Sequence, residues 1–260
     1  MCKLPCKKIG NARALACLAC RRVATVAGGA VIDGVKERVV LKTSDRVLLG
    51  SGVLIPCWLL LGVALTALAY PGYSHLQQAM SELGAQGAPT HGFSAWVNNL
   101  PLGLLFILFG LGVARRFPGS KLALLSALLI GLHGLGSLGT GYFACDQGCA
   151  PAQPSLSQQL HNLAGLLMFV SLTLACALWI VLARRLLQSP GLALFSALCL
   201  VLAIVTAWLM ATAVASGQLF GLYQRLNYGI SVLWVAALAL QILRASAGRS
   251  AQPSTAARAM

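Results

Sequence analysis

The sequence has very few charged residues for its length. Of its 260 residues only 9% are Asp, Glu, Lys or Arg, whereas 58% are hydrophobic. A soluble domain carries about 25% charged residues because its surface faces water. A chain with so little charge cannot cover a water-facing surface, so most of its exterior must face lipid. The composition therefore excludes a soluble globular protein, and the length suits one membrane bundle of about six spans.

Acidic residues are the scarcest class. The chain has five Asp and Glu against 19 Lys and Arg, which gives a formal net charge of +14. In a soluble protein that excess would suggest a nucleic-acid partner. Here the bases fall in short clusters between apolar runs, and ten of the 19 precede residue 47, so they form no continuous surface. We expect no nucleic-acid partner, because attraction to anionic lipid headgroups accounts for the bases.

Familiar catalytic motifs are also missing. The sequence contains no Walker loop, no dinucleotide fingerprint and no Gly-x-Ser-x-Gly. It therefore identifies no catalytic residue and no cofactor, and it does not set the oligomeric state. The lipid bilayer is the one partner that the composition predicts.

The N-terminal region differs from the rest. It is basic and contains four cysteines, but it has no apolar run long enough for a signal peptide. The cysteine spacing is too irregular to predict a zinc site. We expect residues 1–45 to be a cytoplasmic leader that is disordered or lies upstream of the true start. Residues 46–244 should form the transmembrane domain, and residues 245–260 a disordered cytoplasmic tail.

Six apolar runs follow the leader. Each has roughly 17–24 residues, enough to cross a hydrocarbon core of about 30 Å as a helix. Backbone groups cannot stay unpaired in lipid, so such runs must be helical. The sequence therefore predicts an all-α bundle of six transmembrane helices. The runs are 47–69, 97–114, 122–143, 161–183, 192–215 and 227–243.

The bases alternate between the loops. Loops 70–96 and 144–160 have no Lys or Arg, and loop five has only Arg225. The second and fourth loops are short and basic, with paired arginines at 115–116 and 184–185. Cytoplasmic loops carry the excess of Lys and Arg in membrane proteins. We therefore expect both termini in the cytoplasm and loops one, three and five on the outer face.

The polar residues of the outer loops are the most informative. Beyond the leader the only carboxylates are Glu82 and Asp146, both in outer loops. Ionisable groups at the membrane edge are costly and often functional. In loop one Pro71 ends the first helix, and Ser74 is a candidate N-cap. We expect a short interfacial helix from Ser74, on which His75 and Glu82 share a face.

Loops three and five add further polar groups. Cys145 and Cys149 should face an oxidising compartment, where a disulfide between them would close a small loop that presents Asp146. Metal binding by this cysteine pair is the alternative. Arg225 has a planar guanidinium that suits an ion pair with Glu82, with Asp146 or with a lipid phosphate.

One ionisable residue, His133, falls within a predicted span. Several glycines surround it, including Gly131 and Gly134, and small residues let helices approach closely. We therefore expect His133 in the bundle interior, where the neutral ring is hydrogen-bonded to a neighbouring helix. A proton relay or a ligand contact is the alternative role.

Several of these segments together resemble a known membrane family. In chain order they are residues 70–89, 143–149, 155–162 and 221–225. They are similar to the bacterial integral membrane family called domain of unknown function 998, over about residues 47–243. The resemblance implies a multi-helix protein of the bacterial inner membrane and supplies no reaction. Residues 81–85 are also similar to an early outer loop of the Frag1/DRAM/Sfk1 membrane family.

Three functions and one structural interpretation fit these residues. The first function is binding of a lipid headgroup or small solute, or organisation of the membrane. The second is a metal-dependent hydrolase with His75, Glu82, Asp146 and His161 as ligands, although no His-x3-His pair is present. The third is a small-solute transporter, although no internal repeat is evident. In the structural interpretation, the polar groups only hydrogen-bond one another and so hold the outer loops in place. The candidate ligand-binding residues are Tyr73, His75, Gln78, Ser81, Glu82, Asp146, His161, Asn162 and Arg225.

Overall fold

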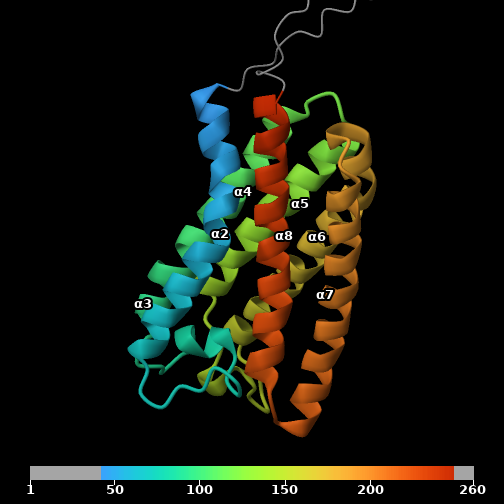
Figure 1. The fold of residues 1–260 in the computed structure, drawn as a ribbon. Helices are drawn as coiled ribbons and strands as arrows, with labels where there is room; N and C mark the ends of the chain where they lie inside the picture. The colour runs from blue at the N-terminus through green and yellow to red at the C-terminus, as the bar shows by residue number, and fades with distance from the viewer. Residues whose placement is uncertain (1–41, 249–260) are drawn as a thin grey trace, which may run out of the picture. The chain divides into compact units, whose positions relative to one another are not determined.

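The structure, a computed structural model, describes residues 42–248 (Figure 1). Most of the predicted leader (1–45) and tail (245–260) lies outside the described residues, but residues 43–45 begin the first helix and residues 245–248 end the last one, so both helices extend beyond the predicted boundaries of the transmembrane domain. Within residues 42–248 the regular elements are all helical, as predicted. They are α2 (Thr43–Leu68), η1 (Met80–Gly84), α3 (His91–Ser94), η2 (Ala95–Asn99), α4 (Leu100–Arg116), α5 (Lys121–Tyr142), η3 (Gln147–Cys149), α6 (Leu156–Leu187), α7 (Pro190–Ser216) and α8 (Phe220–Gly248).

Six helical segments within this range are long and apolar enough to cross a membrane, which confirms the predicted six-helix membrane protein. The second span joins α3, η2 and α4. Helix α6 begins at Leu156, five residues before the predicted apolar run, because its first turn is polar. The Ser155 hydroxyl caps that turn by accepting from the Gln158 N–H at 3.1 Å.

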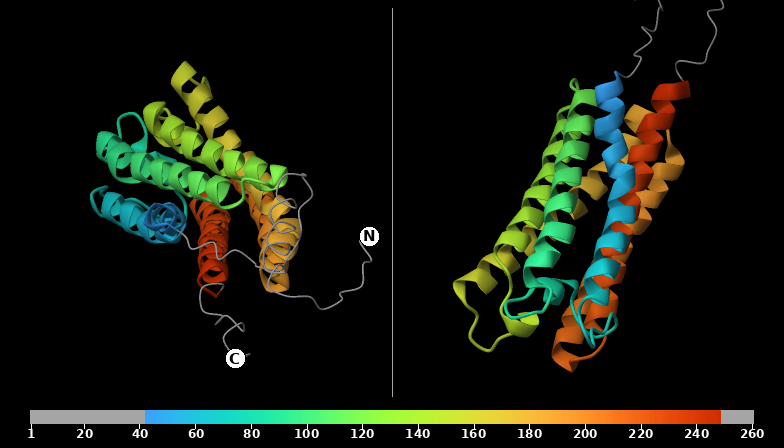
Figure 2. Two further views of the ribbon diagram at one scale, coloured as in Figure 1. Left: turned by 90° about the horizontal axis from the view of Figure 1, so that it is seen from above. Right: turned by 90° about the vertical axis from the view of Figure 1, so that its left-hand side faces the viewer.

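The six spans pack in a ring. Helices that follow one another in the sequence lie side by side, and α8 closes the ring against α2 (Figures 1 and 2). Short turns at residues 117–120 and 188–189 make these neighbours antiparallel. We call the side with Arg115 and Arg184 the basic end. The opposite side, with the connections 69–90, 143–155 and 217–219, is the loop end.

The basic half of the bundle is filled by large side chains. Trp179 and Trp234 are each at most 1% exposed. The Trp179 indole N–H donates to the Ser126 hydroxyl at 2.8 Å, and that of Trp234 donates to the Ser196 hydroxyl at 3.0 Å. A buried indole needs such a partner because its N–H cannot reach water. Both tryptophans therefore belong to the buried core of the basic half.

Glycines bring α4 and α5 into direct backbone contact. A Cβ placed on Gly103 would lie 2.8 Å from the Gly134 carbonyl oxygen. A Cβ on Gly134 would lie 2.6 Å from the Gly103 carbonyl oxygen. No larger residue fits at this crossing without moving the helices apart. The glycines that surround His133 in the sequence therefore set how closely its helix approaches α4.

Loop one contains a short helix, as predicted, but at a different place. The 3₁₀ helix η1 begins at Met80, whereas the prediction began the helix at Ser74. Residues 74–78 form a single turn, closed by the Gln78 N–H donating to the Ser74 carbonyl. The Glu82 carboxylate accepts from the Ala79 N–H at 2.8 Å and so caps the later helix instead.

Candidate functional site

The second span is irregular where it enters the bundle. Five residues, Ala95–Asn99, form a π turn, η2, before α4 begins. Pro101 has no N–H, so the Val97 carbonyl lacks its usual helical donor and accepts from the Trp58 indole at 2.8 Å. Turns of this kind are rare and often occur at functional sites. Here the turn brings two adjacent amides, Asn98 and Asn99, to the wall of one cavity.

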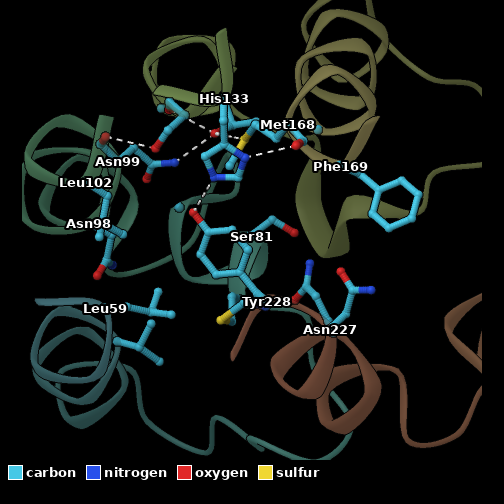
Figure 3. Close-up of a pocket in the computed structure, with 18 of the residues that line it drawn as sticks. Leu59, Ser81, Asn98, Asn99, Leu102, His133, Met168, Phe169, Asn227 and Tyr228 are labelled. Carbon is cyan, nitrogen blue, oxygen red and sulfur yellow. Dashed lines mark hydrogen bonds between the residues drawn. The ribbon is translucent and has the colours of Figure 1, made fainter. Parts of the chain in front are cut away.

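This cavity lies in the loop-end half of the bundle, as its lining residues from loop one indicate. Figure 3 shows the side chains around it. Its volume is about 340 Å³, within the range of small-molecule sites. All six spans contribute to its lining, and η1 of loop one contributes Met80, Ser81 and Gly84. The lining contains no Lys, Arg, Asp or Glu. The cavity is therefore an uncharged site with both polar and apolar walls.

His133 forms part of the inner wall of the cavity. It is 1% exposed, and its Nδ1 lies 2.9 Å from the Met168 carbonyl oxygen. A carbonyl only accepts, so Nδ1 carries the proton. In the neutral ring Nε2 accepts from the Tyr228 hydroxyl at 3.1 Å. The buried, hydrogen-bonded position predicted for His133 is confirmed, and these bonds join α5, α6 and α8 below the cavity.

Two carboxamides present acceptor oxygens to the cavity. The Asn99 Nδ2 donates to the Thr140 hydroxyl at 3.0 Å, and the Asn227 Nδ2 donates to the Ala203 carbonyl at 2.8 Å. Thr140 itself donates to the Ser137 carbonyl, so it can only accept from Asn99. Neither Oδ1 has a hydrogen-bond partner among residues 42–248, and neither is buried. Each oxygen is thus open to the cavity.

His161 adds a third acceptor. Its Nδ1 donates to the Phe143 carbonyl at 2.8 Å, which leaves Nε2 of the neutral ring as an acceptor without a partner in the described part of the chain. Asn98 differs, because its Nδ2 donates to Thr66 and Ser94 while its Oδ1 is buried against Gly62. The Asn99 Oδ1, the Asn227 Oδ1 and the His161 Nε2 are thus three acceptors at the cavity without a partner in the described part of the chain.

Residues 73–84 of loop one, which we call the roof, cover the loop end of the cavity. Arg225 of α8 is hydrogen-bonded to this segment. The Arg225 guanidinium donates to the Tyr73 hydroxyl at 2.6 Å and to the carbonyls of Gln78 and Gly221 at 3.0 and 2.9 Å. It makes no ion pair with a carboxylate in residues 42–248, so the predicted pairing with Glu82 or Asp146 is wrong. Backbone carbonyls from the two connected segments already surround the guanidinium, and each carboxylate has other donors.

Further bonds join the roof to α8. The Met80 N–H donates to the Gln224 Oε1 at 2.6 Å, and the Leu222 N–H donates to the Leu76 carbonyl at 2.9 Å. Burial raises the pKa of Tyr73, and the nearby Arg225 only partly opposes this. Tyr73 therefore stays a neutral phenol, able to donate to the Ala79 carbonyl at 2.7 Å.

Loop three forms a separate cluster. The Asp146 carboxylate accepts from the Ser155 hydroxyl at 2.6 Å and from the Ser155 N–H at 2.9 Å, and these bonds lower the pKa of Asp146. Cys145 and Cys149 are joined by a disulfide across a Cα–Cα distance of 5.0 Å. The Gln86 N–H donates to the Cys145 carbonyl at 2.8 Å and connects this cluster to loop one.

The predicted site residues therefore fall into four places. Tyr73, Gln78, Glu82 and Arg225 belong to the roof, where the Gln78 amide donates to Glu82 at 3.0 Å. His75 is exposed, with its ring edge-on to Tyr73. Asp146 of loop three and Asn162 of α6 are linked through Gln158. Only Ser81 and His161 line the cavity.

The four predicted metal ligands do not converge. His75 lies beside Tyr73, Glu82 bonds loop one, Asp146 bonds Ser155, and His161 bonds the Phe143 carbonyl. Among residues 42–248 there is no group of three or more His, Cys, Asp or Glu placed to hold a metal ion.

The sequence interpretation missed most of the cavity residues. Asn99, Asn227 and Tyr228 were counted as parts of apolar runs, although all three line the cavity. A signal was present, because amides within membrane spans are costly and face protein or cavities rather than lipid. The adjacent pair Asn98 and Asn99, two residues before Pro101, was the strongest such signal.

Comparison with known proteins supports the family resemblance. No curated protein and no solved structure matches the chain. One family model matches residues 53–241, and its description is Protein of unknown function (DUF998). The match spans all the loops that carried the resemblance and most of the six-helix bundle. This chain therefore belongs to the DUF998 family.

Proposed function

We propose that this multi-pass membrane protein is a binding protein whose cavity holds an uncharged ligand bearing hydroxyl or N–H donors. The observation that carries the proposal is the set of open acceptors in the polar wall: the Asn99 and Asn227 carboxamide oxygens and the His161 Nε2. Polar atoms at membrane depth need partners, and a donor-bearing ligand supplies them.

The absence of Lys, Arg, Asp and Glu from the cavity lining favours an uncharged ligand. A phosphate or carboxylate in this cavity would meet no Lys or Arg among the lining residues. Arg225, which follows the lining residue Gln224 in the sequence, already donates to loop one and to Gly221. A buried unpaired charge is far more costly than a buried hydroxyl that is hydrogen-bonded. A neutral polar group is therefore favoured over an anionic headgroup.

The alternative functions have less support. A metal-dependent hydrolase needs converging ligands, and the described residues contain no such group. Transporters usually place their site between repeated halves of the chain, and no internal repeat is evident in this sequence. A binding role needs only the cavity and its roof.

We also propose the orientation that the loop charges predict, with both termini in the cytoplasm of a bacterial cell and the cavity in the outer half of the inner membrane. Cysteine substitutions at exposed Gln86 and Gln188 test it. In intact spheroplasts a membrane-impermeant maleimide should label the Gln86→Cys protein and spare the Gln188→Cys protein. The reverse pattern would invert the orientation.

Ligand binding can be tested with a simple uncharged probe. Purified protein in detergent is melted with added monooleoylglycerol, whose head has two hydroxyls, or with phosphatidylglycerol, whose head is anionic. We expect monooleoylglycerol to raise the melting temperature and phosphatidylglycerol to have little effect.

Two variants locate the effect. His161→Phe and Asn99→Leu each remove an open acceptor, and each should weaken the response to monooleoylglycerol by roughly tenfold in half-saturating concentration, as for one lost polar contact. The control is Gln159→Leu, which removes an exposed amide outside the cavity lining. If the variants respond like wild type, or if only the anionic lipid stabilises the protein, the proposed function is wrong.

A further inference from the structure

The two halves of helix α6 differ in how deeply their residues are buried. From Ser171 to Leu187 buried residues recur at every turn, as in a helix packed on both sides. From residue 159 to residue 170 no residue is buried. This loop-end half contacts α5, where Cβ atoms on Gly136 and Gly139 would meet Met168 and Ala164, whereas its Gly165 and Phe169 line the cavity.

The reason is that α6 and α7 diverge. At the basic end they are joined closely, and the Cys176 Sγ lies 3.2 Å from the Ser196 carbonyl oxygen. Toward the loop end α6 stays with α5 while α7 stays with α8, so the two helices separate (Figures 1 and 2). The ring of six helices is thus tight at the basic end and opens between α6 and α7 at the loop end.

The residues at this opening are small or apolar. Gly165 and Phe169 of α6 and Ala207 and Met210 of α7 line the cavity and are all partly exposed. A Cβ placed on Gly165 would meet no atom within 4 Å, so open space lies directly beside it. The opening is therefore an apolar gap at membrane depth, and what faces it there is hydrocarbon rather than water.

Polar and apolar side chains both line the cavity. Asn99 lies across the cavity from Phe169, which is at the open side (Figure 3). The water-facing side is covered by η1, which the bonds from Arg225 and Gln224 hold to α8. A ligand that contacts both Asn99 and the apolar residues at the gap has a polar head near η2 and an apolar chain that leaves toward the lipid.

We infer that the ligand is a lipid-like amphiphile with an uncharged hydroxyl-bearing head, and that it enters from the bilayer between α6 and α7. This rests on the proposed function, since it assumes that the cavity binds a neutral donor-bearing head. The chain passes Gly165 and Phe169 on one side and Ala207 and Met210 on the other. The loop-one roof stays closed during entry, because the route does not cross it.

Photocrosslinking tests this route directly. The probe is a monoacylglycerol with a diazirine at mid-chain, added to the full chain in lipid nanodiscs, with labelled residues mapped by mass spectrometry. Specific labelling is the part that excess monooleoylglycerol removes. We expect it on residues 165–169 and 207–210.

A matched pair of variants closes the opening or leaves it unchanged. Gly165→Leu places a side chain in the gap, and Gly131→Leu adds the same bulk on α5 outside the cavity lining; a Cβ at either position meets no atom within 4 Å. Gly165→Leu should reduce specific labelling by roughly tenfold, as for displacement of a packed group. Gly131→Leu should label like wild type.

The outcomes separate the two proposals. Specific labelling confined to η1 or the loop-one roof would show entry from the water side, which overturns the route and leaves the proposed function intact. Specific labelling that persists unchanged in Gly165→Leu also overturns the route. Absence of any specific labelling in folded wild-type protein, together with no stabilisation by monooleoylglycerol, would overturn the proposed function and the inference with it.

Discussion

Gly221 is the position where loop one and α8 are closest, so adding one methyl group there should loosen the roof of the cavity. A Cβ on Gly221 would collide with the Gln78 carbonyl oxygen. It would also lie 2.8 Å from the His75 carbonyl oxygen and 2.9 Å from the Arg225 Nη1. The backbone of loop one must therefore move in a Gly221→Ala protein. The bond from the Gly221 N–H to the Gln77 carbonyl, 3.2 Å long, would weaken as it does so.

The expected magnitude follows from two opposing effects. Within a helix, Ala is normally favoured over Gly by about 0.4–1 kcal/mol. Overpacking a well-packed contact costs about 1–3 kcal/mol, and each weakened hydrogen bond adds about 0.5–1.5 kcal/mol. We expect a net destabilisation of about 2 kcal/mol. Loop one should also become more accessible to protease, because the displaced segment is the roof itself.

Gly229→Ala is the matched control on the same helix. A Cβ at Gly229 meets no atom within 4 Å, so only the favourable helix effect remains. Thermal unfolding of both variants in detergent, followed by circular dichroism, measures the difference. If Gly221→Ala melts at or above the temperature of Gly229→Ala, the close contact between loop one and α8 does not exist as described.

Three further predictions concern the rest of the bundle. Ser126→Ala should lower stability by about 0.6 kcal/mol, the average for polar bonds between membrane helices, because the Trp179 indole loses its acceptor. An unchanged denaturation curve would show that the bond contributes nothing. Asp146 has a lowered pKa in the folded state because of Ser155, so its contribution is present above the unfolded pKa of about 3.9 and is lost as pH falls through the folded value. Asp146→Asn should therefore melt below wild type at neutral pH, with the difference closing in acid; a constant difference across the pH series would contradict this. The loop-three disulfide closes a very short loop, so by the loop-entropy relation a Cys145→Ser protein should lose about 2 kcal/mol of folding stability. Peptide mapping without reductant should find the crosslink in wild type but not in this variant.

The membrane fold could be predicted from the sequence because it depends on local properties of the chain, namely the length and hydrophobicity of each run. Each span is an apolar run long enough to cross a bilayer, and in lipid such a run has to be helical to satisfy its own backbone. The buried position of His133 could be predicted for a similar reason, since the glycines around it indicated close helix packing. These inferences need no knowledge of which helix lies next to which.

The roof of the cavity could be predicted only in part. Loop one, Arg225 and Glu82 were recognised as an unusual polar set, but the expected ion pair is replaced by bonds from Arg225 to carbonyls and to Tyr73. Opposite charges in a sequence suggest a pair, whereas the backbone groups that compete for the same donors become visible only when two segments are placed together. The helix start at Met80 likewise depends on Glu82 capping Ala79 rather than on the candidate cap at Ser74.

By itself the sequence determined a six-helix membrane protein with polar connections at one end, because hydrophobic length and helix formation are local properties. Only the tertiary structure decided where the polar groups meet. The π turn that brings Asn99 to the cavity, the position of Asn227 across from it and the divergence of α6 from α7 all depend on how helices rotate and cross. Those angles are set by contacts between residues far apart in the chain, such as Gly103 with Gly134, and no local pattern encodes them.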